Sequence, residues 1–77
     1  MNQAILFNDD FSFDDKENAW CLTAQLSGQA IKIYFHSTQL KQLVMIDSAT
    51  KFDLEELTEQ WIEKNEIEGN IIYLELS

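Results

Sequence analysis

The strongest constraint on the fold is a pair of alternating stretches, AWCLTAQL (19–26) and QAIKIYFH (29–36), separated by Ser27 and Gly28. Alternating apolar and polar residues are typical of strands with one buried face, and a two-residue Ser-Gly connection favours a tight hairpin turn. That loop also fixes the register, and one face then carries the apolar pairs Trp20–Phe35, Leu22–Ile33 and Ala24–Ile31. Because a slip of one residue would break this match, the sequence predicts an antiparallel hairpin.

Two more strands are predicted near the ends of the chain. The short apolar run AILF (4–7) is a candidate first strand, and IIYLEL (71–76) alternates as a last strand. In the last strand, Ile72, Leu74 and Leu76 are expected to face inward. Tyr73 and Glu75 then face outward.

Two helices are predicted between the hairpin and the last strand. Ser37 is a candidate N-cap for a helix over residues 38–46. Thr50, with Asp53 three residues later, has the spacing of a capping box and predicts the start of a second helix. The residues expected to face inward are Leu40, Leu43 and Val44 in the first helix, and Leu54, Leu57 and Trp61, flanked by Ile62, in the second.

These elements predict one α+β domain over residues 1–77, in the order β-β-β-α-α-β. The economical arrangement is a mainly antiparallel sheet with both helices packed on one face. The pattern does not determine the strand order.

The charge of the chain excludes two classes of partner. The chain has fourteen acidic residues, five lysines and no arginine, which gives a formal net charge of −9. A phosphate backbone would be repelled, and no arginine is present to grip phosphate or guanine, so no direct nucleic-acid binding is expected. An anionic membrane surface is disfavoured for the same reason.

The compartment expected from the sequence is the cytoplasm. MNQAILFNDD has no positive n-region, and no stretch approaches the ~20 apolar residues of a membrane span. Cys21 is the only cysteine, which fits a reducing compartment. His36 is the only histidine, so a zinc cage of several cysteines and histidines is excluded; no metal and no cofactor are expected.

The segment DDFSFDD (9–15) raises the question of a cation site, because four aspartates bracket two phenylalanines. Its acids lack the alternating spacing, the central glycine and the final glutamate of a calcium loop. The favoured interpretation is an acidic connection between strands. Phe11 or Phe13 is expected to be buried, with the carboxylates mostly in water.

The second helix carries the clearest charged surface, in the form of five glutamates expected on the face opposite its apolar residues: Glu55, Glu56, Glu59, Glu63 and Glu66. Like-charge pairs four residues apart destabilise a helix by about 0.2–0.5 kcal/mol each. The pattern is therefore not optimised for helix stability. It predicts either a solvated face, which the sequence favours, or a docking face for a basic partner.

The outer face of the hairpin suggests two further sites. Cys21 and His36 lie diagonally across the predicted register, as a thiolate–imidazole dyad would require, but no oxyanion hole or third group is recognisable. Tyr34 and Tyr73, with Cys21 and Ile71, could form an amphipathic patch that supports a homodimer. Ordinary half-exposed sheet surface is the competing interpretation.

Short motifs along nearly the whole chain resemble a known family. They are ILF-x-D (5–9), Phe13-Asp14, A-Q-x-x-G (24–28), the strand IKIYF (31–35), Leu40, the acidic helix, and Gly69 with Ile71, Ile72 and Leu74. The chain resembles domain-of-unknown-function family 1488, small uncharacterised bacterial proteins of α+β fold. The resemblance implies a fold and brings no activity, substrate or site residue.

The sequence favours a non-catalytic interaction or accessory module that binds an unidentified protein partner. Two alternatives stay open at this point. One is a thiol-dependent enzyme that uses Cys21 and His36, and the other is an acidic DNA mimic that inhibits a nucleic-acid-binding protein.

Overall fold

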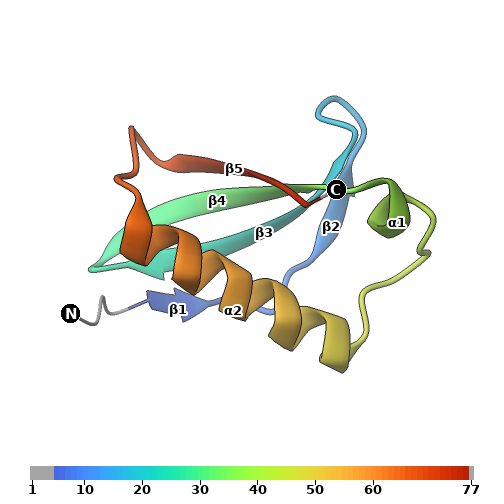
Figure 1. The fold of residues 1–77 in the computed structure, drawn as a ribbon, viewed down its shortest axis with the longest axis horizontal. Helices are drawn as coiled ribbons and strands as arrows, with labels where there is room; N and C mark the ends of the chain where they lie inside the picture. Colours follow the sequence, from blue (N-terminus) through green and yellow to red (C-terminus); the bar gives the residue numbers. More distant parts are fainter. Residues whose placement is uncertain (1–4, 77) are drawn as a thin grey trace.

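The computed structural model describes residues 5–76, which form a five-stranded sheet and two helices (Figure 1). The elements in chain order are β1 (Ile5–Phe7), β2 (Ser12–Asp14), β3 (Ala19–Leu26), β4 (Gln29–His36), α1 (Thr38–Lys41), α2 (Ser48–Lys64) and β5 (Ile71–Glu75). The predicted α+β class is confirmed. None of the helices in the described part of the chain is long and apolar enough to cross a membrane.

The sheet has the strand order β1-β3-β4-β5, and β2 pairs with β3 beside β1. All pairs are antiparallel except β4 with β5, which run parallel. A parallel neighbour requires a crossover, and α1 and α2 supply it. As a result, β5 ends the sheet on one side, while β1 and β2 share the opposite edge.

The β3–β4 hairpin has the predicted register, with Trp20 opposite Phe35 and Leu22 opposite Ile33. Ser27 and Gly28 both have positive φ, 51° and 84°. Two left-handed residues are what a type I′ turn requires, and its twist matches that of the flanking strands. The turn chemistry and the apolar pattern therefore specify the same pairing.

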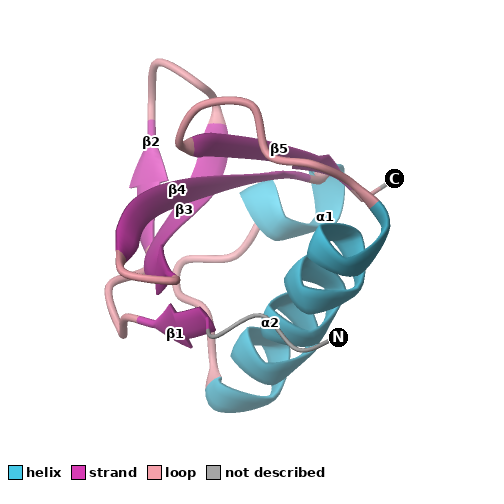
Figure 2. Cartoon of the chain, turned by 90° about the vertical axis from the view of Figure 1, so that its left-hand side faces the viewer, coloured by secondary structure: helices cyan, strands magenta, loops and turns pink. Residues whose placement is uncertain are grey.

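Helix α2 lies across one face of the sheet, and α1 lies on the same side near the end of β4 (Figure 2). Leu54 and Ile62 of α2 and Leu40 of α1 join the inward residues of the sheet in one buried cluster. Phe35, Leu22 and Ile33 are its most deeply buried large side chains. Both helices thus pack on one face, as predicted.

The first helix is shorter than predicted, because it ends at Lys41 and not at residue 46. Ser37 caps it as expected, and its hydroxyl accepts a hydrogen bond from the Leu40 backbone N–H. Its last turn tightens, since Leu43 N–H donates to the Leu40 carbonyl three residues back. The chain then leaves the core, so the expected inward positions of Leu43 and Val44 are wrong; these side chains are 41% and 95% exposed.

The second helix begins earlier than the predicted Thr50 cap. Asp47 is the N-cap, and its carboxylate accepts a hydrogen bond of 2.8 Å from the Thr50 backbone N–H. The buried residues are Leu54, Thr58 and Ile62. Leu57 is 40% exposed, so its predicted inward position is wrong. Thr58 is fully buried, and its hydroxyl is satisfied there because it donates a hydrogen bond to the Leu54 carbonyl.

The segment 9–15 contains a short strand, β2, where the sequence predicted only an acidic connection between strands. Phe11 is half-buried against Phe35, with ring centroids 5.9 Å apart. Phe13 stays more exposed and meets the edge of the Trp20 ring at 5.7 Å. The aromatic residues therefore attach this strand to the core, although neither ring is fully buried.

Candidate functional site

The outward side of α2 combines acidic residues with one aromatic side chain. Phe52, Asp53, Glu56, Glu59 and Glu63 are all exposed. Helical periodicity places Phe52, Glu56, Glu59 and Glu63 in one stripe, because they are spaced by four, three and four residues. We call the five residues the acidic outer face.

Phe52 belongs to this face, although it is not among the site residues predicted from the sequence. Its side chain is 71% exposed in the second turn of α2. A signal was present in the sequence, because Phe52 lies seven residues before Glu59, on the same side of the helix.

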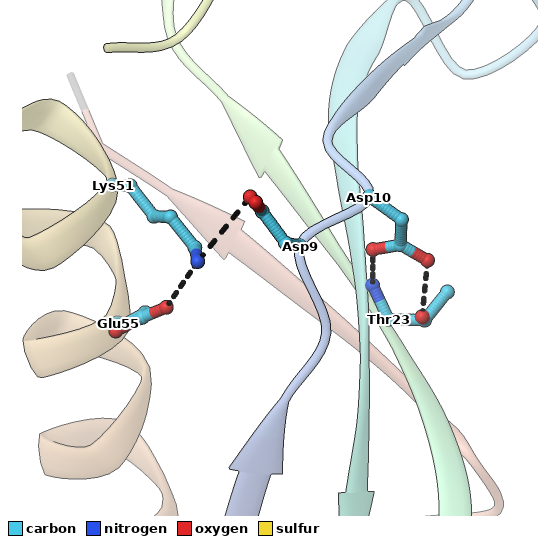
Figure 3. Close-up of polar contacts among 5 residues, drawn as sticks. All are labelled: Asp9, Asp10, Thr23, Lys51 and Glu55. Carbon is cyan, nitrogen blue, oxygen red and sulfur yellow. Dashed lines mark hydrogen bonds and ion pairs between the residues drawn. The ribbon is translucent and has the colours of Figure 1, made fainter. Parts of the chain in front are cut away.

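Glu55 does not belong to the acidic outer face. Its side chain is only 18% exposed and lies 3.5 Å from Lys51 Nζ, which also lies 3.4 Å from Asp9 Oδ1 (Figure 3). Although burial opposes the charged ammonium, the two carboxylates outweigh that effect and raise the pKa of Lys51. Lys51 therefore attaches α2 to the segment before β2 and is directed away from the outer face.

Glu66 is also separate from the acidic outer face, since α2 ends at Lys64 with Asn65 as its C-cap. Glu66 lines a hollow of about 320 Å³ between the end of α2 and the β3–β4 turn, together with Leu26, Gln29, Ile31, Ile62, Asn65, Ile67 and Gly69. Of the five glutamates predicted on one face, the structure therefore brings Glu56, Glu59 and Glu63 together.

The outer face of the sheet carries the predicted tyrosine patch. Tyr34 and Tyr73 stack with ring centroids 5.4 Å apart and planes 15° from parallel. Tyr34 is buried, whereas Tyr73 is 51% exposed at the edge of the sheet. His36 meets Tyr73 edge-on at 6.1 Å. The register places Cys21 beside Tyr34, and both form a small buried cluster with Ala19.

The arrangement of Cys21 and His36 does not favour a reactive thiolate. The two residues lie on the same sheet face as expected, but the ring of His36 packs against Tyr73. Burial raises the pKa of the Cys21 thiol, as do Asp10 and Asp14, while Lys32 lowers it. A thiol nucleophile needs the opposite shift.

Two of the four aspartates in residues 9–15, Asp10 and Asp14, accept hydrogen bonds from the protein itself. Asp10 accepts hydrogen bonds from the backbone N–H of Thr23, at 3.1 Å, and from the Thr23 hydroxyl (Figure 3). Asp14 accepts from the backbone N–H groups of Lys16 and Glu17, which closes the turn into β3. Asp9, Asp10 and Asp15 are nevertheless exposed and Asp14 is half-buried, so the carboxylates lie mostly at the surface, as expected. Residues 5–76 contain no group of three or more acidic, histidine or cysteine side chains placed to hold a metal ion.

One solved structure gives a close comparison. It is the crystal structure of a protein of unknown function from the DUF1488 family of Shewanella loihica PV-4. The TM-score is 0.70 and the sequence identity 27%, over 96% of this chain and 94% of that chain. Neither the protein-family models nor the curated proteins gave a match. In fold and over nearly its whole length, the chain resembles the DUF1488 family, as its sequence motifs predicted.

Proposed function

We propose that this protein is a non-catalytic interaction module whose acidic outer face binds a positively charged segment of a partner protein. The observation that carries the proposal is the exposure of Phe52 beside the carboxylates of Glu56, Glu59 and Glu63 on one side of α2. Its single free thiol, Cys21, supports a reducing compartment such as the cytoplasm.

Phe52 supplies the apolar contact in this proposal. A phenylalanine that is 71% exposed contributes little to the core, and an aromatic ring buried on binding is a frequent source of affinity. The carboxylates around it would hold the partner in register and accelerate its approach. Together they describe a surface with an aromatic anchor and a charged rim.

The charge of the face defines the chemistry of the partner. Helix α2 has two lysines, and Lys51 is held by Asp9 and Glu55 on the inner side. The other, Lys64, lies in the last turn beyond the stripe. The matching segment would therefore present lysines or arginines at helical or extended spacing beside an apolar residue that covers Phe52.

The test is affinity capture from cells of the source organism with immobilised protein, compared between matched variants. In the first variant, Glu56, Glu59 and Glu63 are changed to glutamine, and in the second Phe52 is changed to alanine. The control changes Asp15 to asparagine and Glu66 and Glu68 to glutamine, which removes the same charge from exposed positions outside the face.

A protein that the wild type and the control capture, that both face variants lose, and that salt elutes supports the proposal. Equal capture by all four proteins, or no enrichment at all, contradicts it. Addition of DNA to the captured complex distinguishes a DNA mimic from a helix that a basic protein segment recognises. If DNA displaces the partner, the face acts as a DNA mimic; if it does not, the partner is a protein that recognises the helix.

A further inference from the structure

The open edge of β5 carries an inference that is independent of the acidic outer face. Asn70 O accepts a hydrogen bond from Lys32 N, and Leu76 N donates to His36 O, both at 2.9 Å. In a parallel pair, alternate residues direct both backbone groups to the same neighbour. The even-numbered residues of β5 therefore face β4. Ile71, Tyr73 and Glu75 direct their N–H and C=O groups to the open edge.

No described strand pairs with that edge, since β5 ends the sheet among residues 5–76. Unpaired edges attract other strands, and proteins commonly protect them with charged residues. Glu75 is the one charged side chain of β5. A strand that pairs with the open edge of β5 is therefore favoured if it places a positive charge near Glu75.

We propose that a second copy of this chain pairs with β5, antiparallel and centred on Tyr73, so that two sheets become one. In this register Tyr73 lies opposite its counterpart, and Glu75 lies opposite Ile71 of the second copy. These are the residues whose backbone groups face the edge, so each opposed pair exchanges two hydrogen bonds.

The charges favour this register over one that pairs Glu75 with Glu75. Lys32 lies beside Ile71 on the outer face, because the two are partners in the β4–β5 pairing. Glu75 of one copy would thus point across Ile71 toward Lys32 of the other, within reach of two long side chains. The symmetry creates this contact twice. A register that pairs Glu75 with Glu75 would oppose like charges.

The apolar surface near the edge is consistent with a second copy. Tyr73 is 51% exposed and stacks on the buried Tyr34, so the dimer would extend this stack into a row of four rings. On the inner face, a hollow of about 260 Å³ beside the same edge is lined by four apolar residues, Leu57, Trp61, Leu74 and Leu76, and by four polar ones, Gln60, Lys64, Asn65 and Glu75. Pairing would remove both surfaces from water.

Light scattering coupled to size exclusion, over a wide range of concentration, tests the dimer. The expected mass is about 18 kDa, twice the 9.0 kDa of one chain. Glu75→Lys and Lys32→Glu should each weaken dimerisation by about tenfold or more, and the double variant should restore it. Glu68→Lys, the same charge change in the turn before β5, is the control. Circular dichroism confirms that every variant folds.

Hydrogen exchange adds a residue-specific measurement. The amides of Ile71, Tyr73 and Glu75 should become protected as the concentration rises, while amides in the loop 42–47 should not change. A monomer at all concentrations overturns the proposal. So does a dimer that Glu75→Lys leaves intact, or one that the double variant fails to restore. None of these results affects the acidic outer face.

Discussion

The indole Nε1 of Trp20 donates a hydrogen bond of 2.7 Å to the backbone carbonyl oxygen of Leu40. Trp20 is buried near the start of β3, and Leu40 is the buried residue of α1. The bond therefore joins a four-residue helix to the core, although such a helix has little stability of its own. The bond therefore holds α1, which lies between β4 and α2 in the chain, against the sheet.

Trp20→Phe should destabilise the protein by about 2–4 kcal/mol, because it leaves the Leu40 carbonyl without its donor and opens a cavity. Urea unfolding measures the change. Trp61→Phe, at a half-buried position of α2, is the matched control and should cost about 1 kcal/mol or less. Equal effects of the two substitutions would show that the hydrogen bond has no special role.

Gly28→Ala should destabilise the protein by about 1–2 kcal/mol through the backbone alone. Gly28 has a φ of 84°, and an added Cβ would meet nothing within 4 Å. Ser27→Asn should instead stabilise the turn by about 0.5 kcal/mol, since asparagine tolerates the left-handed conformation better. Thermal unfolding of both variants measures these opposite changes, and two changes of the same sign would contradict the turn assignment.

Asp47 should make the stability of α2 depend on pH in the acid range. The backbone hydrogen bond from Thr50, with a side-chain hydrogen bond from Thr50, lowers the pKa of Asp47 below its usual 3.8. The resulting stabilisation is present above that pH and is lost as the pH falls through the lowered value. Asp47→Asn retains a cap and should flatten this part of the stability–pH curve, whereas Asp15→Asn should leave it in place.

Cys21 should react slowly with thiol reagents in the folded protein. Its burial raises the thiol pKa above the ordinary 9.0, so less thiolate is present at neutral pH. Alkylation by iodoacetamide should be slower than in the unfolded chain by about tenfold or more. Because the folded pKa is the higher one, stability relative to Cys21→Ser should fall as the pH rises above 9.0. Fast alkylation of the folded protein would revive the thiol-enzyme alternative.

Much of the sheet could be predicted because two local signals agreed. The Ser27-Gly28 turn and the apolar alternation fixed the same register. No such agreement existed for residues 38–46, where leucine and valine had helical spacing but Lys41 ended the helix. The strand β2 could not be predicted either, because its pairing partner, β3, specifies it through tertiary contacts.

The candidate site was predicted in part. The spacing of Glu56, Glu59 and Glu63 placed them on one side of α2, where all three are exposed. Glu55 turned inward because Lys51, which Asp9 also contacts, offers it an opposite charge that periodicity alone does not reveal. Phe52 was missed because an exposed aromatic contradicts the ordinary expectation that large apolar residues are buried.

Binding through the acidic outer face is tested most directly by the affinity of the captured partner for the purified protein, measured at low and at high salt. For the wild type, the Kd should rise steeply with salt. With Glu56, Glu59 and Glu63 changed to glutamine, binding should weaken by about tenfold or more and lose most of that salt dependence. A Kd that is the same for the wild type and this variant at both salt concentrations would contradict the account.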